Sequence, residues 1–404
     1  MPLPTFARIF QAVRIGRLLS GQNLGWEWCG GLCSRWTVII ALGKGEREVT
    51  LVLSIEEQRE ILDMKNVLEA LEILYKEEAA GRALSRRRSD TIVPNQIGVY
   101  GLKSMDGVVP AFDVGVVRIN SDVVTWPTAG KTKRRVKVPA APGNRWVGLI
   151  LLFSISTGEP LAIMPDGYVQ RMRVGGTSGL GVKYLAREDA KVLGLIGSGW
   201  QAGSQVLAAC QVRDFDKVMV YSPTRENLVS FVREIGPQVK ADVQAADSSE
   251  TVLSEADVVL CATNSLQPVF DGKLVRPGQH LGCIKHCELD DNAFKRADRM
   301  VIHTPSASPM HQVMETVLME ELSGDQGWAD DHGGIDWNGV PTLAQLVTGA
   351  VQGRNSPDEV TCFVNNLGLG IQFAAVGARL YEIAHERGVG RELPTEWFTQ
   401  NVHP

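Results

Sequence analysis

Small residues at a fixed spacing follow an apolar run in the stretch KVLGLIGSGWQAG, where Gly197, Gly199 and Ala202 form the pattern GxGxxA. In this pattern the first glycine allows a tight turn, the second lets the backbone approach a diphosphate, and the third small residue lets a helix pack closely on a sheet. The free N–H groups at the start of that helix attract a phosphate. The spacing therefore predicts a dinucleotide site. The residues expected to form it are Gly197, Ser198, Gly199, Trp200, Gln201 and Ala202.

The surroundings of this short motif strengthen the prediction. A GxGxxA pattern alone is a weak signal, but here a strand-like run precedes it and a helical pattern follows it. The alternative is a structural turn in another α/β fold. The indole of Trp200, inside the turn, could stack near the cofactor or pack the helix against another domain.

Polar residues after the next apolar run bear on which dinucleotide is bound. The run ends in YSPTREN, so Ser222, Thr224 and Arg225 stand where an NAD site usually places an acid for the ribose hydroxyls. An acid would repel a 2′-phosphate, whereas hydroxyls and a guanidinium would bind it. The sequence therefore favours NADP over NAD. The alternative role for Arg225 is a solvated residue in the first turn of a helix.

The elements that must position this motif alternate between strands and helices from about residue 173 onward. Such alternation predicts a parallel sheet joined by right-handed crossovers. The expected strands are 192–196, 217–221, 256–261, 280–284 and 299–302, with helices at 200–211 and 224–234.

The chain before this point has a different pattern. Residues 49–53 indicate a strand, and Ser54 with Glu57 forms a capping box for a helix that runs toward Ala80. The sequence then predicts short strands over 92–126, a surface loop over 127–145, a hairpin in WVGLILLFSISTGEPLAIMPDG and, near the C-terminus, a helix that ends at Gly388. The expected fold class is α/β, with a Rossmann-type parallel sheet domain and a second α+β domain.

Composition excludes several classes of protein. The 404 residues are 44% hydrophobic and 22% charged with a net charge of −5, which is ordinary for a soluble protein and gives no basic surface for nucleic acid. No apolar run reaches the roughly 18 residues that a membrane helix needs. Seven cysteines in so long a chain do not indicate a disulfide framework, so a cytoplasmic location is expected.

Residues 1–48 form an extension of a different character. The stretch MPLPTFARIFQAVRIGRLLSGQNLG contains Arg8, Arg14 and Arg17 but no acid, as a mitochondrial presequence does. A disordered extension is the favoured alternative. Cys29 and Cys33 have no second pair of ligands nearby in the sequence, so no metal site is expected there.

Several stretches together resemble the ornithine cyclodeaminase/mu-crystallin family over about residues 50–392. They include LSIEEQREILDM, TGEPLAIMPDGYVQRMRVGGTSGLGVKYLAREDAKVLGLIGSGWQA, SEADVVLCATNSLQPVFDGKLVRPGQHL, AFKRADRMVI and NNLGLGIQFAAVGARLYE. The spacing between VQRMRVGG and GSGWQAG is also similar to that of a branch of the family labelled tyramine oxidase.

This resemblance implies a homodimer with two domains per subunit. Residues 49–175 plus 360–404 would form a dimerisation and substrate domain, and residues 176–359 would form the Rossmann domain that binds NAD(P). Family members reduce cyclic ketimines, oxidise amino acids or cyclise ornithine. Each reaction passes a hydride between a nicotinamide and the carbon that bears the substrate nitrogen.

The resemblance also implies which residues hold the substrate carboxylate. Arg173, in QRMRVGG, matches the family's arginine before the Rossmann domain, and Arg88, in SRRRSD, matches an earlier one. A planar guanidinium binds a carboxylate through two parallel bonds. The family's pocket lysine falls on Arg118 with a one-residue gap or on Gly115 without one. Arg118 would stay charged and could not shuttle a proton, whereas Lys103 could supply a titratable amine.

Two departures from the family pattern bear on the reaction. Asn264 and Ser265 stand where the cyclodeaminases carry an aspartate, which disfavours ornithine cyclisation and leaves hydride transfer intact; Thr263 and Asn264 are expected near the cofactor. In LGCIKHCE, Lys285 or His286 could donate a proton, with a polar loop as the alternative. Three ligands within these few residues would fit a zinc site poorly, so no metal is expected.

The sequence therefore predicts an NAD(P)-dependent oxidoreductase that acts on the carbon–nitrogen bond of a small carboxylate-bearing imine or amino acid. The partners expected are this small molecule and a second copy of the chain, with no nucleic acid and no membrane. One alternative is a lyase of the ornithine cyclodeaminase type with bound NAD. The other is a non-catalytic NADPH-binding protein or accessory subunit. His303, after RMVI, is expected to end a strand and not to act as a catalyst.

Overall fold

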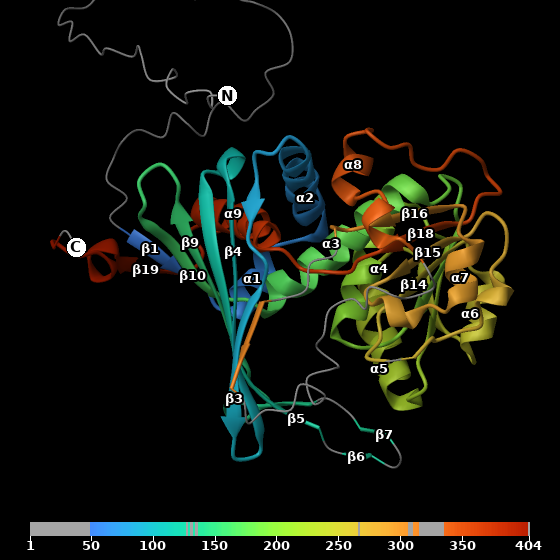
Figure 1. Cartoon of the computed structure of the whole chain (residues 1–404), viewed down its shortest axis with the longest axis horizontal. Helices are drawn as coiled ribbons and strands as arrows, with labels where there is room; N and C mark the ends of the chain where they lie inside the picture. The colour runs from blue at the N-terminus through green and yellow to red at the C-terminus, as the bar shows by residue number, and fades with distance from the viewer. Residues whose placement is uncertain are drawn as a thin grey trace, which may run out of the picture. The chain divides into compact units, whose positions relative to one another are not determined.

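The computed structural model describes residues 49–126, 128–129, 132–133, 136–265, 267–305, 310–314 and 335–402. These residues form two large β-sheets with helices packed on them (Figure 1). The predictions about residues 1–48 lie outside the described residues. No helix in the described ranges is both long and apolar enough to cross a membrane.

The first sheet is mostly antiparallel and has the strand order β17-β3-β4-β5-β9-β10-β1-β19, with the short strands β2 and β8 pairing at its side. In β4 and β5 every second side chain is buried, as expected for a sheet with one face covered. The strands are β1 Val49–Val52, β2 Leu84–Ser85, β3 Ser89–Asn95, β4 Gly98–Val109, β5 Val114–Thr125, β8 Val136–Val138, β9 Val147–Ser154, β10 Pro160–Pro165, β17 Met310–Val313 and β19 Arg391–Pro394, and a separate hairpin joins β6 Thr128–Ala129 to β7 Thr132–Lys133.

Register places the predicted polar residues of this sheet on its covered face. Lys103 pairs with Asn120, and Met105 pairs with Arg118, so all four side chains point to the same side. All four are buried. The covered face of the first sheet is therefore charged in part, which is unusual for a protein core and indicates a functional role.

Three helices cover that face: α1 Ile55–Ile61, α2 Met64–Ala79 and α9 Gly370–Arg387. The capping box of Ser54 and Glu57 is present. The single helix predicted to run to Ala80 is wrong, because Leu62 adopts an extended conformation and Asp63 caps a second helix through its side chain. Helix α9 ends at Gly388, which has a φ of +63°, as predicted.

The long helix α3, Gly167–Leu185, follows the first sheet and leads into the second. It is buried along most of its length, and its glycines contact other elements closely. A Cβ on Gly175 would lie 2.4 Å from the carbonyl oxygen of Ser204, and one on Gly179 would lie 2.7 Å from the Cβ of Ala208. Small residues thus let α3 pack directly against helix α4, Trp200–Val212.

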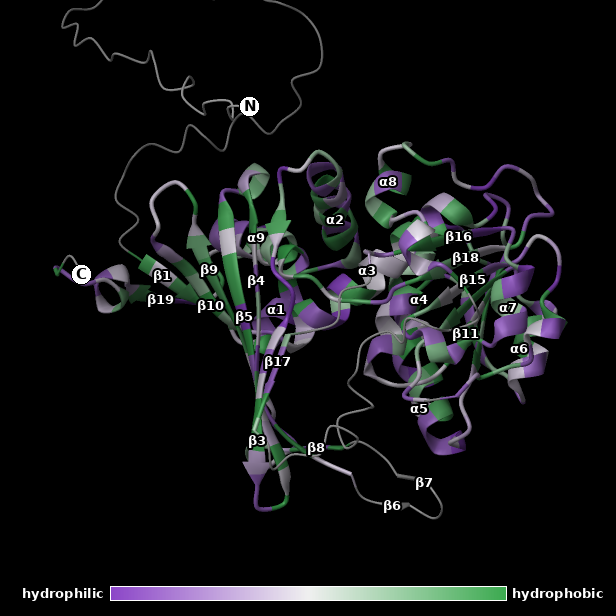
Figure 2. Ribbon diagram, in the orientation of Figure 1, coloured by the Kyte–Doolittle hydropathy of each residue, from purple (hydrophilic) through white to green (hydrophobic). Residues whose placement is uncertain are grey.

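The second sheet is parallel throughout and has the order β13-β12-β11-β14-β15-β18-β16, which confirms the predicted fold class. Figure 2 shows hydrophilic residues on the helices α5, α6 and α7 around it. The strands are β11 Val192–Ile196, β12 Lys217–Tyr221, β13 Asp242–Ala245, β14 Val258–Cys261, β15 His280–Cys283, β16 Arg299–Ile302 and β18 Thr361–Val364, and the helices are α4, α5 Arg225–Ile235, α6 Ser249–Glu255, α7 Asp291–Arg296 and α8 Leu343–Val347.

Two strands lie on the other side of the domain limits predicted from the sequence. Strand β18 belongs to the parallel sheet although residues from 360 onward were assigned to the first domain, and β17 pairs with β3 although 176–359 were assigned to the second. A four-residue buried strand such as β18 has no periodicity that separates it from the helix that follows. Strand β17 was unrecognised because its partner is more than 200 residues away in the chain.

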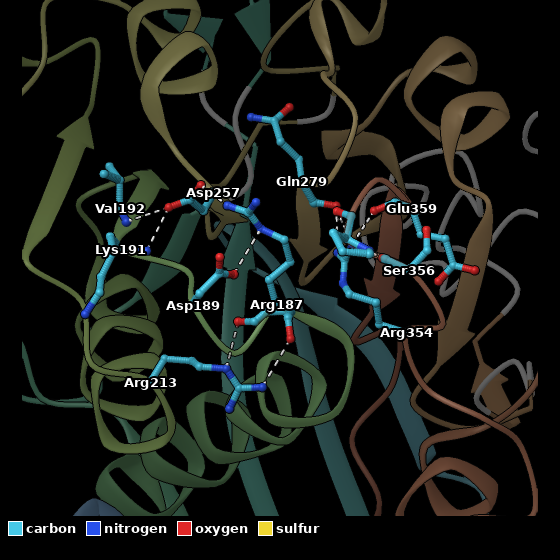
Figure 3. A network of polar contacts seen from close by, with 12 residues as sticks. Arg187, Asp189, Lys191, Val192, Arg213, Asp257, Gln279, Arg354, Ser356 and Glu359 are labelled. Atoms are coloured by element: carbon cyan, nitrogen blue, oxygen red, sulfur yellow. Dashed lines mark hydrogen bonds and ion pairs between the residues drawn. The ribbon is translucent and has the colours of Figure 1, made fainter.

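At the amino-terminal ends of the parallel strands, a polar network holds the scaffold (Figure 3). Asp257 accepts hydrogen bonds from the backbone of Lys191 and Val192 and from Arg187. Arg213 and Arg354 donate to carbonyl oxygens at the end of α3 and in the loop before β18. A cavity of about 1120 Å³ opens at this edge. Its arginines already have carbonyl or carboxylate partners, so this edge has a structural role.

Candidate functional site

The glycine turn lies at the opposite edge, where the carboxyl ends of the parallel strands meet. Gly197 has a φ of +118°, and a Cβ there would lie 2.3 Å from the carbonyl oxygen of Ala262, so only glycine fits. Nothing lies within 4 Å of the Cβ position of Gly199, which begins α4. Ala202 is fully buried between helix and sheet. The turn thus has the open backbone and the helix start that a dinucleotide diphosphate requires.

The residues predicted to contact the ribose lie just beyond β12. The hydroxyl of Ser198 donates to that of Ser222 at 2.9 Å, which ties the glycine turn to the end of the neighbouring strand. Thr224 precedes α5 without capping it through its side chain, and Arg225 is the first residue of that helix. Thr224 and Arg225 are both exposed. Their side chains are therefore accessible to a ligand at this edge.

A buried carboxylate, that of Glu288, joins the ends of β14 and β15. One oxygen accepts hydrogen bonds from the backbone and the hydroxyl of Thr263, at 2.6 and 2.7 Å. The other accepts from the backbone of Ile284 and Lys285, at 3.0 and 3.1 Å. Burial raises the pKa of this carboxyl, and its hydrogen bonds oppose the shift. Glu288 thus fixes the loop of Thr263 to the loop that carries Lys285. Sequence reasoning missed this acid.

The two other loop residues predicted here occupy surface positions. Asn264 is exposed after β14. His286 is partly buried and begins the short 3-10 helix His286–Glu288. Both positions lie at the carboxyl edge of the parallel sheet.

Two arginines from different elements lie over one aromatic ring. The guanidinium carbon of Arg118, on β5, is 5.3 Å from the centroid of Phe373, and that of Arg173, on α3, is 5.1 Å from the same centroid. Arg118 is paired with Asp166, whose Oδ2 lies 2.7 Å from Nε and 2.6 Å from Nη2. Asp166 and Phe373 were not predicted from the sequence.

Arg173 has only a neutral partner among the described side chains. Its Nη1 donates to Oε1 of Gln372 at 3.0 Å, its buried Nε has no hydrogen bond, and no described carboxylate is within ion-pair distance. Burial, followed by the charge of Arg118, lowers the pKa of Arg173 to about 10. The group therefore remains cationic at neutral pH. An unneutralised buried cation beside a neutralised one provides a site for one anion.

A buried hydrogen-bond network holds the side chain of Gln372. Its amide nitrogen donates to Tyr75 at 3.1 Å and to Thr177 at 2.7 Å. Tyr75 also lies 2.9 Å from Nε2 of His303, whose Nδ1 is 2.6 Å from the carbonyl of Leu367. A carbonyl only accepts, so Nδ1 carries the proton. Burial lowers the pKa of His303 to about 3, so the ring is neutral and Tyr75 donates to Nε2. His303 does follow a strand, as predicted, but it is also part of the support for Arg173.

Arg88 and Lys103, both expected near the substrate, lie at the other end of the covered face. Arg88 donates through Nε and Nη2 to both oxygens of Asp90, at 2.9 and 2.8 Å. Lys103 is opposite Asp90 in the sheet register and is buried. His311, on β17, approaches the same carboxylate at 3.5 Å. Two donors of Arg88 are thus already occupied by a side chain of its own strand.

Contacts of Arg173 place it at the same edge of the parallel sheet as the glycine turn. A Cβ on Gly368 would lie 2.7 Å from both terminal nitrogens of Arg173. Gly368 and Leu367 follow the carboxyl end of β18, and His303 follows that of β16. Ligands of open parallel sheets bind outside the carboxyl ends of the strands. The arginine and the dinucleotide turn therefore serve a common site.

Comparison with known proteins agrees with this arrangement. A model of the ornithine cyclodeaminase/mu-crystallin family matches residues 131–388. Delta(1)-pyrroline-2-carboxylate reductase of Bacillus cereus is 30% identical over 349 residues, which cover 85% of this chain and 99% of that protein. Ketimine reductase mu-crystallin of Rattus norvegicus is 25% identical over 68% of this chain and 79% of that protein.

A solved structure adds a ligand-bound relative. Delta(1)-pyrroline-2-carboxylate reductase of Thermococcus litoralis, in complex with NADH and L-proline, is 26% identical to this chain. The match has a TM-score of 0.69 and covers 85% of this chain and 100% of that one.

Proposed function

The chain belongs to the ornithine cyclodeaminase/mu-crystallin family, and we propose that within this family it reduces small cyclic imines that carry a carboxylate on the imine carbon. At the coarser level it is an NAD(P)-dependent oxidoreductase that acts on the carbon–nitrogen bond of a carboxylate-bearing imine or amino acid. The observation that carries the finer proposal is the unneutralised guanidinium of Arg173 beside the paired Arg118.

In this proposal the two arginines do most of the positioning. Arg173 binds the substrate carboxylate, and Arg118, already neutralised by Asp166, adds a directional donor next to it. Phe373 supplies an apolar face below both groups, which keeps water from competing with the carboxylate. Holding the imine carbon in one place converts binding into rate.

The reduced nicotinamide, when bound on the glycine turn, supplies the hydride. The imine enters protonated, as an iminium, so hydride addition to carbon yields the neutral amine without a further proton. No described group has to act as an acid in this step. Lys285 and His286, beyond the end of β15, can exchange the proton of the product with solvent.

We propose NADP as the preferred coenzyme. The end of β12 presents hydroxyls and Arg225 in the place where an acid would exclude a 2′-phosphate. The free cysteines of the described chain support a reducing compartment, and we propose the cytoplasm.

We also propose that the first sheet forms a homodimer through its uncovered face. Leu102 on β4 and Val147 and Leu149 on β9 are 43%, 42% and 38% exposed. The uncovered face of an antiparallel sheet is normally polar, so exposed apolar residues on these strands indicate a surface covered by another protein. A second copy of the same sheet provides the complementary apolar surface.

The test is a turnover assay that follows the absorbance of NADPH or NADH with cyclic imino carboxylates of five- and six-membered rings. Oxidation of the coenzyme with a carboxylate imine, and none with the same ring lacking the carboxylate, is the expected result. Ammonia release from ornithine without net coenzyme oxidation would replace the proposal with the lyase. Tight NADPH binding without turnover of any imine would replace it with an accessory role.

A further inference from the structure

Arg171 is a second buried arginine on α3, two residues before Arg173, with no role in the site described so far. It is 8% exposed, and it forms no hydrogen bond or ion pair with any side chain of the described ranges. Its Nε is buried without a partner. Its guanidinium carbon lies 4.2 Å from the ring centroid of Trp200, the residue inside the glycine turn.

The position of Arg171 beside α4 is fixed by close packing. A Cβ on Gly203 would lie 2.0 Å from Nη2 of Arg171, so glycine at 203 makes room for the guanidinium. Trp200 and Gly203 are three residues apart and therefore on one side of α4. Arg171 thus lies against the first turn of the helix whose free N–H groups begin the dinucleotide site.

The two arginines of α3 serve opposite sides of that helix. Arg171 shares a side with Gly175 and Gly179, four and eight residues on, and this side packs against α4. Arg173 is about 200° away around the helix, because each residue advances the helix by about 100°. One face of α3 therefore contacts the coenzyme helix, and another carries the arginine that faces Phe373.

The charge balance around Arg171 lacks an anion. Burial lowers its pKa, and the exposed Glu234 opposes that shift while Arg59 adds to it. A buried guanidinium without hydrogen-bonded counter-charge is unfavourable unless a ligand supplies the charge. The adjacent helix start has the same need, since its dipole and free N–H groups also favour an anion.

We propose that Arg171, held on the face of Trp200, is a determinant of coenzyme affinity that supplies buried positive charge to the diphosphate of the dinucleotide. The inference rests on the dinucleotide-binding part of the proposed function and not on its substrate. The diphosphate neutralises Arg171 when it binds at the start of α4. Trp200 covers the guanidinium, so that solvent and salt weaken the attraction less than on an open surface.

The experiment measures binding of ADP-ribose, which contains the diphosphate but no nicotinamide, by isothermal titration calorimetry. We compare the wild type with Arg171→Met, Arg171→Lys and the control Arg59→Met. Arg59 lies 5.3 Å from the same indole but is exposed. We expect Arg171→Met to raise the dissociation constant about tenfold or more, Arg171→Lys to restore most of the affinity, and Arg59→Met to change it less than about twofold.

Salt dependence separates charge from folding. Added salt is expected to weaken ADP-ribose binding less in Arg171→Met than in the wild type, because one attraction has been removed. Equal affinity and equal salt dependence in Arg171→Met would overturn the proposal. So would equal losses in the Met and Lys variants together with a lowered melting temperature, which would assign Arg171 a packing role. Because no turnover is measured, failure of the imine reductase assay leaves this test intact, and wild-type protein that binds no ADP-ribose would instead remove the dinucleotide site itself.

Discussion

Arg118 and Arg173 share the ring of Phe373 but differ in what neutralises them. Arg118 has the carboxylate of Asp166 at 2.6 Å, whereas Arg173 has the amide oxygen of Gln372 at 3.0 Å. The pair therefore carries one balanced and one unbalanced charge in a buried place. This asymmetry suits a ligand with a single carboxylate, because a second anion would find no free cation there.

Replacing Arg173 is expected to abolish recognition of the carboxylate. Arg173→Met should lower kcat/KM for a carboxylate imine by about 100-fold or more, since it removes a charge-assisted pair of bonds. The dissociation constant of NADPH should change little. The control is Arg86→Met, because Arg86 is an exposed arginine paired with Asp106. Unchanged turnover in Arg173→Met would show that the carboxylate binds elsewhere.

Gln372 is expected to matter because it is neutral. Gln372→Glu places a carboxylate where Oε1 now accepts from Nη1 of Arg173, so the arginine is neutralised internally. The KM for the imine should rise about tenfold or more, while the affinity for NADPH is retained. Steady-state kinetics and coenzyme titration measure both quantities. A variant with unchanged KM would contradict the role of Arg173 as the free cation.

Buried histidines make stability depend on pH in the acidic range. Burial lowers the pKa of both His303 and His280 to about 3, below the value of about 6.5 in an unfolded chain. Between these values the unfolded chain binds more protons, so the free energy of unfolding falls as the pH falls. Each histidine contributes a slope of up to about 1.4 kcal/mol per pH unit.

The variant His280→Asn isolates one of these slopes. Nδ1 of His280 is hydrogen-bonded to Thr361 at 2.9 Å, and asparagine retains a polar atom near that position without a titrating ring. Urea unfolding at several pH values from about 7 to about 5 should show a shallower loss of stability in the variant than in the wild type. Parallel curves for the two proteins would argue against a depressed pKa at this position.

An acid at the end of β12 is expected to reverse the coenzyme preference. Ser222→Asp places a negative charge beside Ser198, where it repels a 2′-phosphate and accepts hydrogen bonds from the ribose of NAD. The ratio of kcat/KM for NADPH over NADH should fall about tenfold or more. Ser254→Asp, at an exposed position on α6, is the control for added charge. A wild type that prefers NADH would refute the assignment of NADP directly.

A charge on the uncovered face of the first sheet is expected to separate the two copies of the dimer. Leu149→Glu buries a carboxylate in the proposed dimer interface, which is strongly unfavourable without a partner. Light scattering coupled to size exclusion should change from dimer to monomer. Val229→Glu, at a residue 51% exposed on α5, is the control and should remain dimeric. A wild-type monomer would remove this interface.

Local rules allowed the dinucleotide turn to be predicted, because strand, glycines and helix follow one another in the chain. The support of Arg173 could not be predicted in this way. Tyr75, Thr177, His303 and Gln372 come from separate elements, and no spacing in the sequence connects them. Their hydrogen bonds exist only after the parallel sheet and α2, α3 and α9 have packed together.

The same limit explains why Arg88 was predicted at the carboxylate and yet is engaged by Asp90. A basic run near a strand shows that a cation is present, whereas its partner depends on which side chain the pleat places next to it. Asp90 is two residues away and on the same side of β3. Such short-range pairs are visible in a sequence only when the strand phase is known.

The pairing of β1 with β19 bears on how the chain is made. Val52 pairs with Arg391, so the first strand of the described chain obtains one neighbour only near the end of synthesis on the ribosome. The parallel sheet, whose strands lie within 192–364, can assemble earlier. During that interval the outer edge of β1 has no partner strand and can pair with other nascent chains. A nascent chain stalled before residue 391 would therefore be a client for molecular chaperones.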